Sequence, residues 1–132
     1  MPWNGAHWFE SFQNAWFERF ARKENISAEA LWDAVDRAEQ GQIDADLGGG
    51  VIKQRIARAG GGKSKGYRSI VLYRKGDRAF FVFGFPKSEQ DNIREDEVLH
   101  FKKMAKQVLA LTDEQLQRLI DNGQFEEVVK DA

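Results

Sequence analysis

The sequence predicts a single α+β domain, in which a helix hairpin precedes a small antiparallel sheet and further helices cover that sheet. Three observations lead to this class. Apolar residues recur at helical spacing near both ends of the chain, and they alternate at strand spacing in its middle. The chain has 132 residues, of which 42% are hydrophobic, so its length suits one domain with one core.

The N-terminal part predicts a short helix hairpin after an extension formed by residues 1–13. A first helix is expected over residues 14–23, because apolar side chains there share one face: Trp16, Phe17, Phe20 and Ala21. Ser27 is a suitable N-cap for a second helix, which is expected to end at Gly41.

The middle of the chain predicts a three-stranded antiparallel meander. Strands are expected over residues 51–57, 67–74 and 79–85, joined by a flexible glycine-rich loop over 60–66 and a tight turn over 75–77. The third strand is apolar on both faces, with Phe81, Phe83 and Phe85 on one and Phe80 and Val82 on the other. A strand of this kind belongs in a sheet that is covered on both sides.

The C-terminal part is predicted to be helical. One helix is expected over residues 95–111, with His100 partly buried in it as a structural residue. Thr112 and Gln115 form a capping-box pattern, so a short final helix should follow and end near Asn122 and Gly123.

Charge is distributed unevenly along the chain. The whole sequence has 20 basic and 21 acidic residues, yet residues 51–87 contain ten basic side chains and one acidic one. This segment therefore carries +9 and the remainder −10. Such a block indicates a binding site for a polyanion on one face. The alternative is a set of solvated side chains that acidic helices of the same protein neutralise.

Several classes of function are excluded or disfavoured. The chain has no cysteine and two histidines, so thiolate sites and His-rich metal sites are ruled out. No P-loop is expected at Gly62-Lys63-Ser64, because Ala57 occupies the position of its first glycine and a strand follows. Asp44 and Asp46 suit a turn better than a metal site. We expect no metal or cofactor. We also expect a cytoplasmic protein, since no apolar segment is long enough for a membrane span or an export signal.

The basic residues of the meander are candidates for one site. Lys53 and Arg55 project to the same side of the first strand, Arg68 follows the loop beside Tyr67, and Lys87 ends the third strand. Because neighbouring strands lie ~4.8 Å apart, these cations can converge on one phosphate. Cations without carboxylates suit phosphodiester cleavage by electrostatic stabilisation, in which the 2′-OH of RNA is the nucleophile.

The sequence resembles the RelE/HigB-like toxins of bacterial type II toxin–antitoxin systems, within the RelE/ParE superfamily. The resemblance covers about residues 17–128 and rests on four segments: Asp44–Gly50, Lys53–Arg58, the GKS-x-GYR run Gly62–Arg68, and Phe83–Lys87 with Asn92-Ile93. It implies a fold of the microbial-RNase type. It also implies ribosome-dependent cleavage of messenger RNA, which inhibits translation and growth, and a neutralising antitoxin with a helix-turn-helix domain.

The resemblance also implies roles for individual residues. Lys53 and Arg55 match the paired basic residues before the loop, Arg68 would stabilise the transition state, and Lys87 would assist the leaving 5′ oxygen. Several relatives have a tyrosine or histidine where this chain has Asn92-Ile93, so the general base is open between Tyr67 and a lysine of lowered pKa. Binding of ribosomal or messenger phosphates is expected from four further residues: Arg58, Lys63, Lys65 and Arg74.

Two other functions stay open. One is inhibition of DNA gyrase without chemistry, as in the ParE relatives, which the missing tyrosine or histidine favours. The other is an RNA-binding module that does not cleave. The convergence of Lys53, Arg55, Arg68 and Lys87 favours the endoribonuclease.

Overall fold

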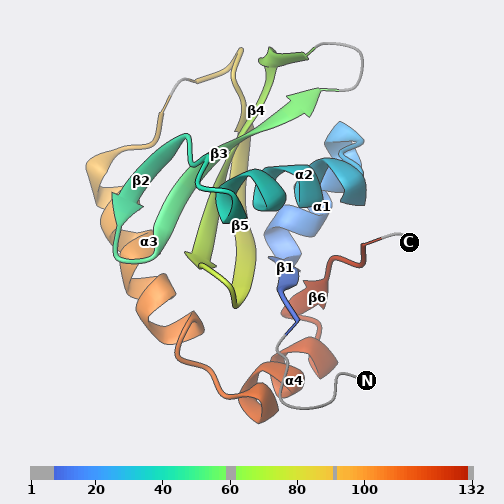
Figure 1. Ribbon diagram of the computed structural model, residues 1–132, viewed down its shortest axis with the longest axis vertical. Helices are drawn as coiled ribbons and strands as arrows, with labels where there is room; N and C mark the ends of the chain where they lie inside the picture. Colours follow the sequence, from blue (N-terminus) through green and yellow to red (C-terminus); the bar gives the residue numbers. More distant parts are fainter. Residues whose placement is uncertain (1–7, 59–61, 91, 131–132) are drawn as a thin grey trace.

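The protein has the predicted α+β architecture. The computed structural model describes residues 8–58, 62–90 and 92–130, and over these it contains four helices and a six-stranded sheet with the strand order β2-β3-β4-β5-β1-β6 (Figure 1). The helices are α1 (Ala15–Glu24), α2 (Ala28–Glu39), α3 (Glu95–Val108) and α4 (Asp113–Asp121). The strands are β1 (Glu10–Asn14), β2 (Ala45–Gly48), β3 (Val51–Arg58), β4 (Gly62–Arg74), β5 (Arg78–Pro86) and β6 (Phe125–Glu127).

The helix ends follow the capping residues in the sequence. The Asn14 side chain accepts a hydrogen bond from the Phe17 N–H and begins α1, and the Ser27 hydroxyl accepts from the Ala30 N–H and begins α2. Thr112 and Gln115 form the predicted capping box of α4. The two-helix hairpin and the final short helix are therefore confirmed.

The predicted meander is confirmed as β3, β4 and β5, which pair antiparallel in this order. The glycine-rich segment differs from the expectation of a long flexible loop, because β4 already begins at Gly62. Gly66 lies against β3 so closely that a Cβ atom there would come within 2.1 Å of the Ile56 carbonyl oxygen. Only glycine permits this approach, so Gly66 is needed for strand pairing.

Three strands were not predicted. β1 comes from the expected N-terminal extension and pairs in parallel with β5, while β6 pairs antiparallel with β1. β2 occupies the segment around Asp44 and Asp46 that was expected to be a turn, and it forms one edge of the sheet.

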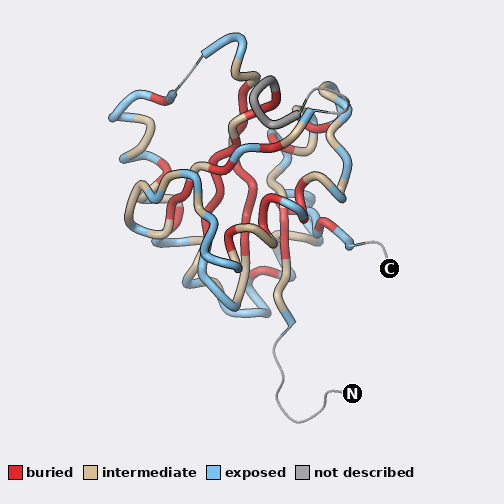
Figure 2. The backbone as a smooth tube through the Cα atoms, turned by 45° about the horizontal axis from the view of Figure 1, so that its top comes forward, coloured by how far each residue is buried: buried red, intermediate tan, exposed pale blue. Residues whose placement is uncertain are grey.

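Helices cover both faces of the sheet, as the apolar β5 predicts. One buried cluster lies under α1 and α2 and includes Phe17, Val35 and Ile56. The other lies under α3 and α4 and includes Phe80, Phe101 and Leu116. In Figure 2 the central strands are buried along most of their length, whereas chain segments at the periphery are exposed.

The face assignment within β5 was partly wrong. The register between β4 and β5 shifts between the pairs Ile70–Phe83 and Val71–Phe81, so Val82 has no partner of its own. As a result Phe85 belongs to the α3-side cluster together with Phe80 and Val82, while Phe81 belongs to the α1-side cluster.

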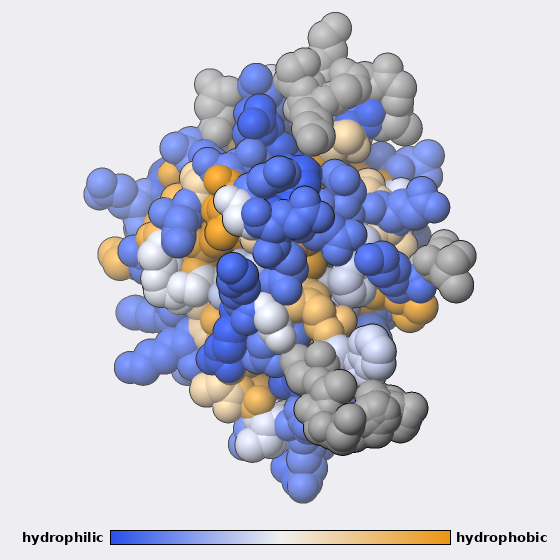
Figure 3. All heavy atoms as spheres, in the orientation of Figure 1, coloured by the Kyte–Doolittle hydropathy of each residue, from blue (hydrophilic) through white to orange (hydrophobic). Residues whose placement is uncertain are grey.

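The surface in Figure 3 is largely hydrophilic, with small apolar areas between charged groups. Within the described residues, no helix is both long and apolar enough to cross a membrane.

Candidate functional site

Three predicted site residues lie on the sheet face that α3 covers. Lys53 is paired with Ile70, two residues along β4 from Arg68, so Lys53 and Arg68 are diagonal neighbours on one face. The Lys87 N–H donates to the Gly66 carbonyl at 3.1 Å, which continues the β4–β5 ladder by one pair. Lys87 is therefore a diagonal neighbour of Arg68 on the same face, across β4 from Lys53. We call Lys53, Arg68 and Lys87 the basic cluster; Arg68 is its central member.

One hydrogen-bond donor of the Arg68 side chain is buried and lacks a partner in the described part of the chain. This donor is the Nη1 atom, which is shielded from solvent. An unsatisfied buried donor costs free energy, and the cost is larger for a charged group. A phosphate can accept two parallel hydrogen bonds from a guanidinium. To offer Nη1 to such a ligand, the Arg68 guanidinium would have to turn toward solvent.

Lys53 is positioned by the segment that follows β5. Its ammonium group donates to the Asn92 side-chain oxygen at 3.1 Å, and the same oxygen accepts from the Ile93 N–H at 3.0 Å. The Ile93 side chain is buried in the α3-side cluster, which anchors the segment. Asn92 therefore stands at the basic cluster.

Arg55 faces Arg68 across the two strands, but it is held by a carboxylate. Its guanidinium donates to Asp44 from Nε at 3.3 Å and from Nη2 at 3.2 Å, and its backbone N–H donates to the same side chain at 2.7 Å. Arg55 therefore lies on the same face as Lys53 and Arg68, as predicted, but in an ion pair with Asp44. Asp44 had been expected in a turn, and its role as a partner was missed.

Asp44 is itself held in place from several sides. Its N–H donates to the buried Gln54 side chain at 2.7 Å, and Arg37 of α2 lies 3.5 Å from its carboxylate. Burial raises the pKa of Asp44, but the hydrogen bonds from Arg55 and the charges of Arg55 and Arg37 outweigh this effect and lower it. Asp44 is thus ionised at neutral pH and neutralises Arg55.

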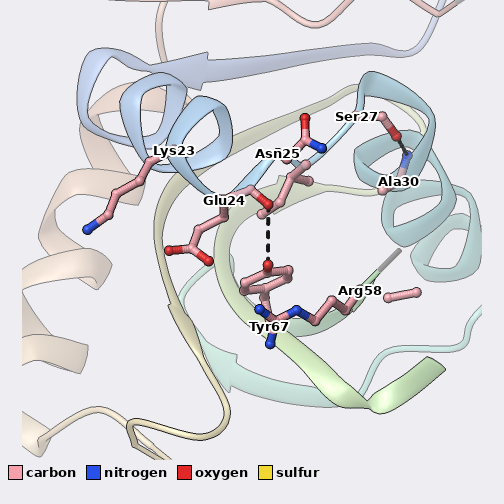
Figure 4. Close-up of a pocket in the computed structure, with 9 residues that line it drawn as sticks. Lys23, Glu24, Asn25, Ser27, Ala30, Arg58 and Tyr67 are labelled. Carbon is pink, nitrogen blue, oxygen red and sulfur yellow. Dashed lines mark hydrogen bonds between the residues drawn. The ribbon is translucent and has the colours of Figure 1, made fainter. Parts of the chain in front are cut away.

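Tyr67 lies on the opposite face of the sheet from the basic cluster. It is 3% exposed, and its hydroxyl donates to the Glu24 carbonyl oxygen at 3.3 Å (Figure 4). Burial and the charge of Glu24 raise the pKa of Tyr67, which disfavours the phenolate that a base requires. The expected place of Tyr67 beside Arg68 in the site is therefore corrected: its side chain is part of the α1-side core.

Arg58 accompanies Tyr67 on that face. Its guanidinium lies 5.8 Å from the centre of the Tyr67 ring, and both line a pocket of about 420 Å³ between the α1–α2 turn and β3. Figure 4 shows the two side chains together beneath Glu24 and Asn25. Arg58 thus lies apart from the basic cluster.

The other predicted phosphate-binding residues are not brought to the basic cluster by the described structure. Arg74 ends β4 six residues from Arg68, about 20 Å along the strand, and pairs with Asp77 at 3.3 Å. The side chains of Lys63 and Lys65 lie outside the described residues. His100 is exposed on α3 rather than partly buried. The Asp46 carboxylate accepts from the Gly48 N–H at 2.9 Å, at the irregular end of β2 rather than in the expected turn.

The basic cluster concentrates positive charge on one sheet face, an arrangement that can attract an anion. A family model described as the RelE toxin of the RelE/RelB toxin–antitoxin system matches residues 10–128. The chain belongs to this family of toxins, and a cognate antitoxin is the partner that the family implies. No curated protein matches the chain closely enough to be named as a relative.

Proposed function

We propose that the protein is an endoribonuclease toxin that cleaves messenger RNA on the ribosome and so inhibits translation and growth. The observation that carries the proposal is the position of Arg68 between Lys53 and Lys87 on one face, with a buried Nη1 that has no hydrogen-bond partner within the described residues. A site of this composition offers charge and hydrogen bonds to a phosphate rather than a nucleophile. RNA supplies its own nucleophile, the 2′-OH.

The proposed reaction needs three contributions from the cluster. Arg68 donates to the nonbridging oxygens of the scissile phosphate and stabilises the negative charge of the phosphorane. The 2′ oxygen forms a bond to phosphorus while the bond to the 5′ oxygen breaks, leaving a 2′,3′-cyclic phosphate and a 5′-OH end. Lys87 is the residue we assign to the leaving 5′ oxygen, which must gain a proton.

The base that accepts the 2′-OH proton is the remaining role. Of the two alternatives from the sequence, Tyr67 is on the wrong face, which leaves a lysine of the basic cluster. We assign the role to Lys53, because Lys87 is already placed at the leaving 5′ oxygen and Lys53 lies diagonal to Arg68 on the same face. A Lys53→Arg variant keeps the charge but cannot be deprotonated, so it should lose cleavage while retaining RNA binding.

The proposed partners are the ribosome with its messenger RNA and the cognate antitoxin. We propose that the antitoxin has a helix-turn-helix DNA-binding domain, and that an acidic surface on it covers the basic cluster or blocks entry into the ribosome. Phosphate contacts by Arg58, Lys63, Lys65 and Arg74 would then lie outside the cleavage site. An antitoxin that bound only the acidic helices and left the basic cluster open and active would contradict this arrangement.

Mapping RNA ends in cells tests the function. The wild-type protein and Arg68→Ala are induced, and the ends of messenger RNAs are sequenced alongside growth measurements. The proposal predicts growth arrest with cuts in phase with codons, and both effects disappear in Arg68→Ala. Growth arrest with intact messages and damaged DNA would instead indicate gyrase inhibition. RNA binding without any cuts would indicate a module that does not cleave.

A further inference from the structure

A group of stacked aromatic rings borders the basic cluster. Trp16 of α1 packs on Phe83 of β5 with 4.7 Å between ring centres, and on Phe20 with 5.4 Å and an interplanar angle of 15°. The Trp16 side chain nevertheless remains 39% exposed. Its indole is thus held in one orientation by two rings while part of its surface is open to solvent.

The rings lead directly to Arg68. Phe83 contacts Phe85 at 6.0 Å and Phe101 of α3 at 5.8 Å, so its ring lies on the α3 side of the sheet. Phe85 is the cross-strand partner of Arg68. In antiparallel strands the Cβ atoms of such partners lie about 5 Å apart. Trp16 therefore lies two ring contacts from the residue that faces Arg68.

We propose that Trp16 stacks on a base of the RNA strand next to the phosphate that Arg68 binds. This inference rests on the proposed function and adds a substrate-positioning residue to it. Single-stranded RNA is held by cations that contact its phosphates and by aromatic rings that stack on its splayed bases, and the two features must lie side by side. Here a partly exposed, preoriented indole is joined through Phe83 and Phe85 to the strand position of Arg68, whose Nη1 has no hydrogen-bond partner among the described residues.

A purely structural role for Trp16 makes a different prediction. If the indole only packs on Phe83 and Phe20, an apolar side chain of similar size should replace it with a small loss of stability and no change in RNA contact. Stacking on a base needs a π face, which Trp16→Phe retains and Trp16→Leu lacks.

The test uses ribosomes programmed with a short messenger RNA that carries 2-aminopurine beside the cleavage position. Binding is followed in the Arg68→Ala variant, which is not expected to cleave the RNA. The fluorescence of 2-aminopurine reports the contact, because it falls when the base stacks. Arg68→Ala should quench the fluorescence, and adding Trp16→Leu should remove the quenching. In the active protein, Trp16→Leu should raise the half-saturating ribosome concentration on the order of 10-fold or more, and Trp16→Phe should largely restore it.

Trp8→Leu is the matched control, because Trp8 is 70% exposed, and it should leave both signals unchanged. Thermal unfolding of each variant separates loss of folding from loss of stacking. Unchanged quenching and unchanged cleavage in Trp16→Leu would overturn the inference and leave the proposed function intact. Quenching in the absence of any cleavage by the wild-type protein would support the stacking contact and overturn the proposed function.

Discussion

The cations near the loop end of β3 and β4 fall into two groups, those with an aromatic or acidic partner and those of the basic cluster. On the face under α1 and α2, Arg58 lies against the Tyr67 ring and Arg37 donates to Asp33 at 3.1 Å. On the face under α3, the basic cluster has no ion pair within the described part of the chain, and the Nη1 of Arg68 has no hydrogen-bond partner there.

Arg55 and Arg68 make the same contrast at the scale of one residue pair. They face each other across β3 and β4, yet Asp44 holds only Arg55. A row of basic residues on adjacent strands therefore does not by itself form a site. What distinguishes Arg68 is a buried donor without a hydrogen-bond partner among the described residues, which costs free energy in the protein alone.

The largest expected effect is the loss of Arg68. Arg68→Ala should lower the rate of RNA cleavage on programmed ribosomes by about 10²–10³-fold, because it removes a donor to the phosphorane. Its stability should be unchanged or slightly higher, since an unsatisfied buried donor is also removed. Arg58→Ala is the control from the other face, measured at saturating ribosome concentration. A comparable loss of the cleavage rate in that variant would contradict the assignment of the cleavage site to the basic cluster.

Gly66→Ala tests how the two strands hold Arg68 in place. The added methyl group would meet the Ile56 carbonyl oxygen, so β3 and β4 must separate next to the cluster. We expect a loss of at least about 2 kcal/mol in the free energy of unfolding, measured in urea. Gly76→Ala is a control at a turn where a Cβ meets nothing within 4 Å, although its φ of 73° disfavours alanine. An equal loss in the two variants would contradict the proposed role of Gly66.

The lysines of the cluster should matter more than Arg55. Lys87→Ala is expected to slow cleavage by about 10²-fold at saturating ribosomes, because general acid assistance is typically worth this much or more. Arg55→Ala, whose guanidinium is already neutralised by Asp44, should change the rate by less than about 5-fold. If Arg55→Ala and Lys87→Ala slowed cleavage equally, the distinction drawn between paired and unpaired cations would not hold.

The smallest expected effect concerns Asp44 and pH. Because its pKa is lower in the folded protein than its unfolded value of 3.8, Asp44 stabilises the fold above that value. This contribution is lost as the pH falls through the folded-state pKa. Asp44→Asn should therefore lower stability by about 1 kcal/mol at pH 7. Denaturation curves at a series of pH values should show the difference shrink below pH 3.8.

Local signals predicted much of the fold. The N-caps Ser27 and Thr112 predicted where two helices begin, and apolar alternation located β3 to β5. The parallel pairing of β1 with β5 is a contact between residues 68 apart in sequence, and a five-residue strand has too little pattern to reveal it. The bulge at Val82 was missed for the same reason, since it depends on the partner strand.

The candidate site was predictable only in part. Alternation placed Lys53 and Arg55 on one side of their strand, because side-chain direction follows from strand periodicity. The register that brings Arg68 to the same face comes from the pairing of β3 with β4. Tyr67 was expected in the site because it is next to Arg68 in sequence. Adjacent residues of a strand point to opposite faces, so the same rule places Tyr67 on the other face. The pairing of Arg55 with Asp44 depends on the buried Gln54, whose contacts across β2 and α2 leave no local trace in the sequence.

The most direct test of the account is a cycle that pairs Arg68 with the scissile phosphate. Cleavage rates are measured on programmed ribosomes for the wild-type protein and Arg68→Ala, each with a normal phosphate and with sulfur in place of one nonbridging oxygen. If Arg68 donates to that oxygen, the sulfur should slow the wild type far more than the variant, with an interaction energy of about 1–3 kcal/mol. Equal slowing of both proteins, for sulfur at either nonbridging position, would show that Arg68 does not contact the phosphate and would contradict the account.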